Sequence, residues 1–240
     1  MFTTRHVQSD PALADRLDPG FWHPAYETLI ARCRLTLRPL GDFIVDITYG
    51  PIVTGKVPPR IADGVPVIHQ GQVSTTGADL RQAVRVPEGS DWDCRPRARV
   101  QRGDLLLPRS GVASVAKNRV CIYHDDAPAV VGSFVNRIAV RGVDPVYALI
   151  CLKSRVVWAQ MHRLINGVGT PNISFEEVRS LLIPWAPAPE QRDLCARYAK
   201  TVHTQHMRWL CGEQAAQAIG IAAFREIAEH LDALCFPDEN

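Results

Sequence analysis

The chain has 240 residues, 46% of them hydrophobic and 22% charged, which is ordinary for a soluble globular protein. It contains no apolar run near the roughly 20 residues that span a bilayer, and its N-terminus lacks the apolar core of a signal peptide. Seven cysteines without a C-x-x-C pair favour reduced thiols over a disulfide framework or a zinc site. These features predict a cytoplasmic protein with no membrane segment.

The net charge of +2 hides an uneven distribution. Residues 81–120 carry nine Lys and Arg against four Asp and Glu, whereas residues 188–240 carry five against eight. A basic body is typical of proteins that meet a polyanion. The chain has 23 Arg and 4 Lys, and Arg grips phosphates and guanine edges well. A GC-rich coding bias would enrich Arg equally, so both explanations stay open.

The first 187 residues divide into a short arm and a mixed domain. Residues 1–35 are expected to form a helical arm, because Pro24 stands where helices commonly begin. The following segment, residues 36–187, contains short β-rich runs bounded by Gly, Pro and Asp, and a helical stretch that starts at Asp144. The β-rich runs are residues 42–47, 65–69, 104–108, 119–123, 129–140 and 180–184. This alternation predicts an α+β domain built on a mixed twisted sheet.

The end of this domain has a dense series of local signals. Ser174 is a good helix N-cap, and Glu177 stands three residues on as its capping-box partner. A short apolar strand ends at Pro184, and Pro187 and Pro189 then form a stiff hinge. The loop before Ser174 contains two glycines that would let the backbone approach a ligand closely.

Residues 188–240 are dominated by helical periodicity. Apolar or small residues recur mostly at steps of three or four from Glu190 to about Phe236. A single helix of about 45 residues would extend roughly 65–70 Å, which exceeds the body of a domain of about 150 residues. Such a helix cannot bury its apolar stripe on its own domain. We therefore expect either a long helix that pairs with another chain or a hairpin that folds back near Gly212 or Gly220.

Six motifs follow one another in a recognisable order. They are LGDFIVDITYG, GVPVIHQGQV, QRGDLLLPRSG, GSFVNRIAV, NGVGTPNIS and LLIPWAPAPEQ. In this order and at these distances they resemble the specificity (S) subunit of Type I restriction–modification systems, over roughly residues 39–235. A full S subunit has two target recognition domains and two helices, whereas this chain matches one of each. It therefore resembles a half S subunit.

The resemblance implies a non-catalytic protein with no cofactor or metal of its own. It assigns residues 36–187 to a DNA target recognition domain and residues 188–240 to a conserved-region helix for dimerisation and methyltransferase (M) docking. The implied partners are double-stranded DNA, an M subunit and a second copy of the chain, with a restriction (R) subunit left open. The helix positions expected to face partners are Leu194, Tyr198, Val202, Trp209, Ile219, Ala223, Ile227 and Leu231.

Residue chemistry within the motifs selects side chains for DNA contact. Gln70 and its neighbours follow a strand, and glutamine pairs naturally with adenine in the major groove. Arg109 can fork onto guanine or hold a phosphate, and only one of Asn136 and Arg137 can face DNA because they alternate along a strand. The full set expected to bind DNA is Lys56, Arg60, His69, Gln70, Gln72, Arg109, Ser110, Lys117, Arg119, Arg137, Thr170 and Asn172. For each, the alternative is a polar side chain that is merely solvated.

No catalytic constellation stands out. The loop GVGTPN lacks the lysine of a phosphate-binding loop, and no methyltransferase motif is present. His203 and His206 lie one helical turn apart but lack a third metal ligand at suitable spacing, so solvated histidines are the favoured interpretation. Two other functions stay open: a small enzyme with a dispersed active site near Asp104 or His124, and a protein–protein adaptor whose basic body is incidental.

Overall fold

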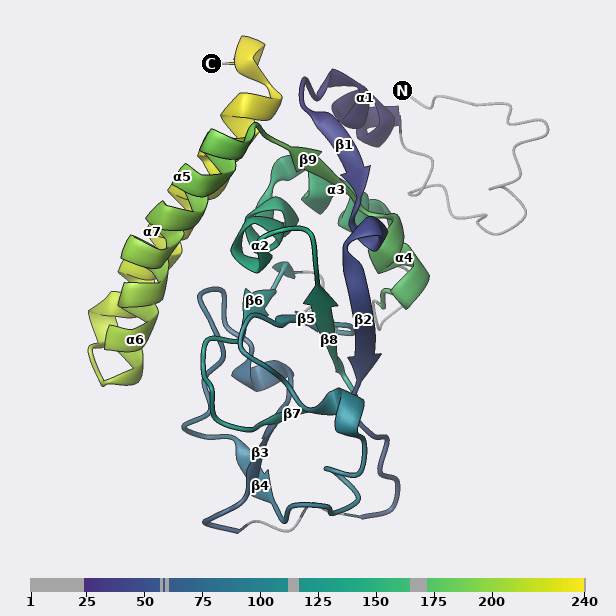
Figure 1. The fold of residues 1–240 in the computed structure, drawn as a ribbon, viewed down its shortest axis with the longest axis vertical. Helices are drawn as coiled ribbons and strands as arrows, with labels where there is room; N and C mark the ends of the chain where they lie inside the picture. The colour runs from purple at the N-terminus through teal and green to yellow at the C-terminus, as the bar shows by residue number, and fades with distance from the viewer. Residues whose placement is uncertain (1–23, 57, 59–60, 112–116, 165–171, 240) are drawn as a thin grey trace, which may run out of the picture.

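The two ends of the mixed domain meet in a two-stranded sheet. The computed structural model describes residues 24–56, 58, 61–111, 117–164 and 172–239. Helix α1 (Pro24–Arg32) leads into β1 (Thr36–Pro39), which pairs antiparallel with β9 (Leu182–Trp185). Figure 1 shows this pair near the helical end of the molecule, with the short strands β3 and β4 at the opposite end and a helical hairpin along one flank.

Two further small sheets form the strand-rich part. The first is antiparallel, in the order β2–β8–β5–β6, and consists of β2 (Ile44–Tyr49), β8 (Val135–Val140), β5 (Leu105–Pro108) and β6 (Cys121–Ile122). The second has the order β4–β3–β7, with β4 (Val84–Val86) antiparallel and β7 (Val130–Val131) parallel to β3 (Val65–Ile68). Strands β3 and β5 are buried at every residue, which explains why they read as continuous apolar runs. The observed architecture is the predicted α+β class.

Single turns of 3₁₀ helix connect several of these strands. They are η2 (Leu40–Asp42), η3 (Gln70–Gln72) and η4 (Pro96–Ala98), and a further turn, η7 (Pro237–Glu239), ends the described chain. Strand β2 also carries an irregularity between Ile44 and Asp46, where its register against β8 shifts. A bulge of this kind bends a strand and re-aims its side chains. Here it places Asp46 within reach of the sheet interior.

The helical stretch expected from Asp144 is two helices. Helix α2 (Pro145–Lys153) ends at Ser154, whose backbone is extended, and α3 (Arg155–Leu164) begins at the next residue. The Ser154 hydroxyl donates to the Cys151 carbonyl at 2.7 Å, so it satisfies a group that the helix end would otherwise leave open. Helix α2 is buried from Tyr147 to Leu152 and forms the centre of the main core.

The predicted capping box at Ser174 is confirmed. Ser174 Oγ accepts from the backbone N–H of Glu177 at 3.2 Å, and the Glu177 carboxylate accepts from the Ser174 N–H at 2.7 Å. This box opens α4 (Phe175–Ser180), which packs against η2. Strand β9 follows directly. The capping residues and the apolar run in this stretch were sufficient to predict α4 and β9 from the sequence.

Residues 188–235 form a helical hairpin, which is the second of the two predicted alternatives. Its first arm consists of α5 (Ala188–Tyr198), the π-helical turn η6 (Ala199–His203) and α6 (Thr204–Leu210), and its second arm is α7 (Gln214–Cys235). The chain reverses at Gly212, whose φ of 102° is accessible to glycine and strained for other residues. Figure 1 shows both arms lying side by side along the body.

The hairpin accounts for most of the apolar stripe within one chain. Of the positions expected to face partners, Leu194, Tyr198, Val202, Trp209, Ile227 and Leu231 are buried. Ala223 is half-buried, and Ile219 is 51% exposed. A helix too long for its own domain is therefore absent from the described residues, because the two arms cover each other and the core around α2. No helix in the described part of the chain is long and apolar enough to cross a membrane.

Candidate nucleic-acid interface

Three polar segments that are far apart in the sequence meet at one place. They are the turn η3 after β3, residues 109–111 after β5, and residues 172–174 before α4. Ser110 and Asn172 form an isolated antiparallel bridge, and the Ile173 N–H donates to the Arg109 carbonyl at 3.2 Å. The second and third segments are thus joined through their backbones. All three were selected from the sequence as DNA-facing.

Gln70 links the first segment to the second. Its side-chain nitrogen donates to the Ser110 carbonyl at 2.5 Å and lies 3.4 Å from the Phe134 carbonyl. The Arg109 N–H also donates to the Phe134 carbonyl, at 3.0 Å. Gln70 was expected to read a base, but its amide nitrogen instead holds two loops together. Its contribution in this structure is to position the neighbours of Arg109.

Arg109 is held on an aromatic face. Its guanidinium carbon lies 4.3 Å from the centre of the Tyr49 ring, and that ring packs against Phe175 at a centroid distance of 5.6 Å. A guanidinium stacked in this way is restrained in position while its edge keeps N–H donors for a planar acceptor. Phosphates and the guanine edge are acceptors of that kind. The arrangement suits Arg109 to the predicted contact.

His69 and Gln72 are half-buried and stabilise their own turn. The Gln72 side-chain oxygen accepts from the His69 N–H at 3.1 Å. Burial lowers the pKa of His69, which keeps its ring neutral at neutral pH. The ring lies so close to Gly132 that a Cβ there would approach Nδ1 to 2.6 Å. Gly132 is therefore required as glycine for His69 to occupy this position.

The cationic residues flanking the three segments differ in exposure. Lys117 is exposed and Arg119 is half-buried. Between them Asn118 adopts a positive φ of 47°, and its side chain donates to the Leu152 carbonyl at 3.0 Å, which anchors this turn on the end of α2. Lys56 is exposed and pairs with Asp91 at 2.5 Å. Arg60 and Thr170 lie outside the described residues.

Arg137 does not face a ligand, contrary to the expectation. Its side chain is buried and forms ion pairs with Asp104 at 2.5 Å and with Asp46 at 2.9 Å. It also donates to the Arg97 carbonyl at 3.1 Å. Asn136 is fully buried as well, so alternation along β8 places neither side chain at the surface. The reason is that β8 is the second strand of its sheet and is covered on both faces.

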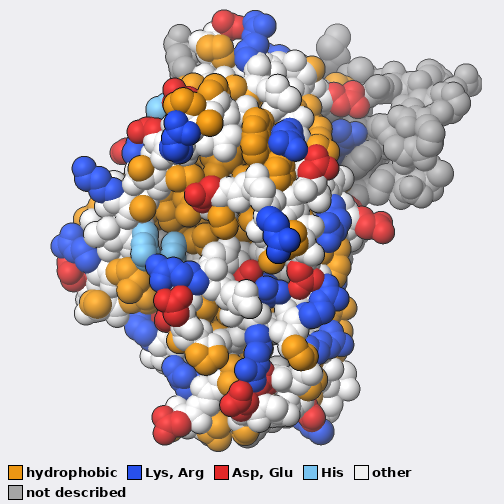
Figure 2. All heavy atoms as spheres, viewed as in Figure 1, with side chains coloured by type: hydrophobic (Ala, Val, Ile, Leu, Met, Phe, Trp, Pro, Cys, Tyr) orange, Lys and Arg blue, Asp and Glu red, His pale blue; other side chains and the backbone are white. Residues whose placement is uncertain are grey.

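Part of the arginine excess in residues 81–120 is paired with carboxylates. Arg97 pairs with Asp46, Arg99 with Asp93 and Glu88, and Arg102 with Asp126. Figure 2 shows Lys and Arg interspersed with Asp and Glu over the strand-rich part of this face. The sequence count of charges therefore overstates the positive field of the body. Arg109 differs from these residues because its guanidinium lies over the aromatic ring of Tyr49.

Sequence reasoning missed several neighbours of the interface. Tyr49 ends β2 and supplies the ring beneath Arg109, and Phe134 contributes a carbonyl while its side chain is 57% exposed. Ile52 is also exposed on the segment that follows Tyr49. Exposed aromatic and aliphatic side chains beside polar turns are a recognisable signal for a contact surface. Of these three residues, only Phe134 lies in a run that the sequence predicts as a strand, residues 129–140.

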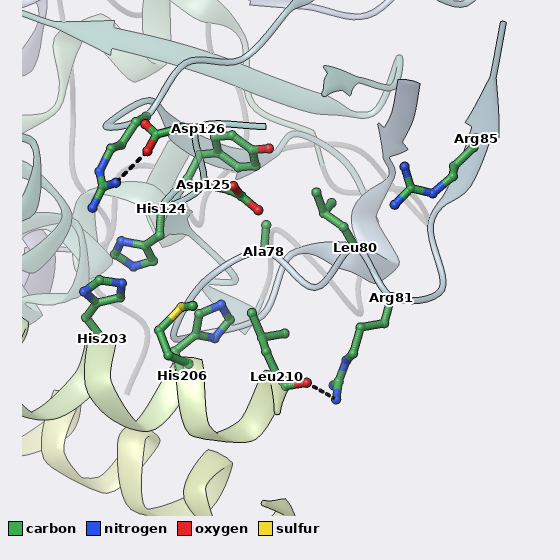
Figure 3. A pocket seen from close by; sticks show the side chains of 13 residues that line it. Ala78, Leu80, Arg81, Arg85, His124, Asp125, Asp126, His203, His206 and Leu210 are labelled. Carbon is green, nitrogen blue, oxygen red and sulfur yellow. Dashed lines mark hydrogen bonds and ion pairs between the residues drawn. The ribbon is translucent and has the colours of Figure 1, made fainter. Parts of the chain in front are cut away.

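A separate cavity of about 480 Å³ lies between the body and the hairpin (Figure 3). His124 stacks on His203 at a centroid distance of 4.2 Å, and His206 lies 5.9 Å from His124. His206 is 2% exposed and hydrogen-bonds through Nδ1 to Thr76 Oγ1 at 3.1 Å, so the solvated-histidine interpretation is wrong for this residue. The described residues contain no group of three His, Cys, Asp or Glu side chains that could hold a metal.

This cavity bears on the enzyme alternative, which expected a perturbed histidine near His124. Burial lowers the pKa of His124 to about 3 and that of His206 to about 4. A general base functions best with a pKa near the working pH, and these rings are poorer bases than that. The residues lining the cavity include no Ser, Thr or Cys, and Thr76 beside His206 is fully buried. The described residues that line this cavity come from both the body and the hairpin.

Comparisons with known proteins bear on the fold. No protein-family model and no curated protein sequence matches the chain. The type IIG restriction endonuclease BpuSI matches with a TM-score of 0.55 and 11% identity, over 90% of this chain and 33% of that one. The HsdS subunit from Thermoanaerobacter tengcongensis matches with a TM-score of 0.49 and 16% identity, over 90% and 50%.

A further match is the Type I restriction–modification S subunit from M. genitalium, with a TM-score of 0.48 and 12% identity, over 73% of this chain and 41% of that one. This chain thus spans half or less of the length of each of these solved proteins. The likeness to BpuSI shows a shared fold. What the chain recognises has to be argued from its own surface.

Proposed function

We propose that the chain is a sequence-specific DNA-recognition subunit of a restriction–modification system, with one target recognition domain. The observation that supports this most directly is the meeting of three polar segments, residues 69–72, 109–111 and 172–174, around the stacked guanidinium of Arg109. Each segment comes from a different motif of the S-subunit resemblance. Their convergence on one surface gives those motifs a common physical role.

In this proposal the contacts with DNA are of two kinds: contacts with base edges, which read the sequence, and contacts with phosphates, which position the protein on the duplex. Arg109 and Asn172 have donor and acceptor patterns that match base edges. Ser110, which was expected to contact DNA, is buried and contributes through its backbone bridge to Asn172. Lys117, Arg119 and Lys56 hold phosphates, which fixes the register of the protein on the duplex without reading sequence. Arg60 and Thr170 belong to the same proposed set. His69, Gln70 and Gln72 support the surface from behind, through the contacts within and beside η3.

The test of this surface compares two arginine substitutions. We expect Arg109→Ala to weaken binding to a preferred duplex by roughly 5- to 150-fold, the equivalent of about 1–3 kcal/mol for a bidentate base contact. Arg225→Ala is the matched control, because Arg225 is exposed on α7 and its removal changes the net charge equally. Fluorescence anisotropy across a salt series measures both. Equal affinities of the two variants would contradict the assignment of Arg109.

The proposal extends to partners. The hairpin would dock a DNA methyltransferase, whose active site the recognition domain places on its target, and a nuclease subunit would join in systems that have one. A homodimer through the hairpin would make the target bipartite and palindromic. Ile219, Ile221 and Met207 are exposed apolar residues on the hairpin that remain available to such contacts.

Partner docking is tested by co-expressing the chain with a candidate methyltransferase and mapping methylated bases in the host DNA. An interrupted palindrome supports the reader role and the symmetric dimer, whereas an asymmetric motif points to a second recognition domain from another protein. The adaptor alternative predicts binding to a protein partner and no salt-dependent affinity for DNA. A monomeric mass in light scattering, both alone and with the methyltransferase, would contradict the dimer.

A further inference from the structure

The N- and C-terminal parts of the described chain are joined at one corner of the molecule. The Arg34 N–H donates to the Cys235 carbonyl at 2.8 Å, so the residue after Cys33 is hydrogen-bonded to the last residue of α7. Two ion pairs across the same junction, Arg32 with Glu239 at 2.8 Å and Arg34 with Asp238 at 2.9 Å, reinforce it. Figure 1 shows α1 and the end of α7 together at the end of the molecule opposite β3 and β4.

Two free cysteines lie at this junction. Cys33 packs against the core cluster that contains Cys235, its thiol donates to the Leu35 carbonyl at 3.7 Å, and the two cysteine side chains lie close enough to influence each other's pKa. The Arg34 N–H, which follows Cys33 directly, is hydrogen-bonded to the Cys235 carbonyl. The α-carbons of Cys33 and Cys235 are therefore separated by little more than one peptide hydrogen bond. Disulfides bridge α-carbons about 4.4–6.8 Å apart, a range that such a separation permits.

The two sulfurs differ in accessibility and acidity. Cys33 is half-buried and lines a surface hollow of about 430 Å³, together with Arg32, Arg34 and Phe236. The hydrogen bond from Cys235 lowers the pKa of Cys33 to about 7, against the opposing effect of burial. Cys235 is fully buried, and donating that hydrogen bond raises its own pKa. Since the thiolate is the reactive form, Cys33 is the sulfur that reacts first.

We propose that Cys33 and Cys235 form a reversible disulfide when the protein meets a peroxide, covalently joining the end of the N-terminal arm to the end of the hairpin. The Cys33 thiolate attacks one peroxide oxygen, the O–O bond breaks, and a sulfenic acid and water or an alcohol form. The Cys235 sulfur then attacks the Cys33 sulfur, the S–O bond breaks, and a second water leaves. The two thiols are oxidised by two electrons, which the peroxide accepts.

The remaining cysteines do not offer the same arrangement. Cys94 and Cys211 are exposed, and the Cys94 thiol donates to the Asp91 carbonyl. Cys121 and Cys151 are fully buried and Cys195 is half-buried, and burial raises the pKa of the Cys121 and Cys195 thiols to about 12. Thiols that burial holds protonated are poor nucleophiles. The proposed pair combines access, acidity and a partner, and it does not depend on the DNA-recognition proposal.

The experiment treats the full chain, reduced and then freed of reductant, with hydrogen peroxide and blocks remaining thiols with N-ethylmaleimide. Chymotryptic peptides are mapped by mass spectrometry, because trypsin would cut at Arg32 and Arg34 on both sides of Cys33. We expect a linked pair of peptides containing Cys33 and Cys235, lost on addition of dithiothreitol. The oxidised protein should melt several degrees higher, since the crosslink closes a long loop in the unfolded chain.

The control is the double variant Cys94→Ser and Cys211→Ser, which should form the same link, whereas Cys33→Ser should not. Mapping of the wild-type chain decides the matter even if Cys235→Ser fails to fold. Three results would overturn the proposal: a crosslink that joins other cysteines, conversion of Cys33 to its sulfinic acid while Cys235 stays alkylatable, or no loss of either thiol at peroxide concentrations that oxidise Cys94 and Cys211.

Discussion

The Arg137 guanidinium lies between two carboxylates inside the sheet of β2, β8 and β5. Breaking a buried pair by removing one partner leaves the other charge uncompensated, which typically costs about 3–5 kcal/mol. We expect Arg137→Met to lose about that much of the free energy of unfolding at neutral pH, because Asp104 would stay buried without its counterion. Urea denaturation measures the loss. Arg97→Met, which removes an exposed partner of Asp46, should lose far less stability than Arg137→Met, because solvent screens an exposed ion pair.

The pH dependence of this variant has a definite sign. Burial already raises the pKa of Asp104 in the folded protein, and Arg137 opposes that rise. Without Arg137 the folded pKa rises further above the unfolded value of about 3.9. A raised carboxyl pKa means that stability is lost as pH rises through it, so the stability deficit of the variant should be smaller in acidic solution than in alkaline solution. A larger deficit in acidic solution would contradict this account.

Residue types alone could not separate the roles of these arginines. Arg137 and Arg109 both lie in motifs with polar neighbours, and the sequence assigned both to DNA. The carboxylates that pair with Arg137 belong to Asp104 and Asp46, which lie 33 and 91 positions away in the chain. No local sequence pattern predicts contacts over such separations. Arg109 lies on Tyr49, which is also far away in the chain.

The hairpin turn is decided by Gly212. Its positive φ lies in the left-handed region, where a Cβ costs roughly 1–2 kcal/mol. We expect Gly212→Ala to lose about that much stability and Gly212→Asn to lose less, because asparagine tolerates this region better. Thermal unfolding of the three proteins, with Cys211→Ala as a neighbouring control, measures the difference. An alanine variant as stable as the wild type would show that the turn can form without a left-handed residue.

Among the helices and strands, the sequence predicted those features that depend on residues close together in the chain. The capping box of Ser174 and Glu177 is present because both partners lie within four residues. The break at Ser154 was missed, because serine is tolerated within helices and its hydroxyl bonds to the backbone carbonyl of Cys151, a group that every residue type carries. The choice between a long helix and a hairpin also stayed open. The helical spacing of apolar residues continues through Gly212. Whether the chain turns there depends on which surface buries those apolar residues.

The whole molecule depends on how the hairpin docks against the body. His124, His203 and His206 lie at this junction, with Asp79, Arg81 and Arg102 as the charged groups that influence them. His124 Nε2 lies 3.1 Å from the hydroxyl of Tyr198 on α5. Burial holds the pKa of His124 at about 3 and that of His206 at about 4. Both rings are therefore neutral in the folded protein near pH 6, whereas unfolded histidine titrates near pH 6.5.

A lowered histidine pKa implies that stability falls as pH falls below the unfolded value, because the unfolded chain then binds more protons. We expect the free energy of unfolding to decrease between about pH 7 and pH 5. The decrease should be shallower in His206→Gln, and unchanged in His162→Gln, whose residue lies on α3 away from this junction. Urea titrations at each pH give the slopes. Equal slopes for all three proteins would show that these histidines are not neutral in the fold.

The central claim is that the surface around Arg109 reads a DNA sequence. The most direct test is selection of duplexes from a random-sequence pool by the full chain, followed by sequencing of the bound fraction. The account predicts an enriched motif whose affinity falls with salt, and loss of enrichment at particular positions in the Arg109→Ala and Asn172→Ala variants. Salt-dependent binding without any enriched motif would contradict this prediction. So would enrichment of the wild-type motif, unchanged at every position, by both variants.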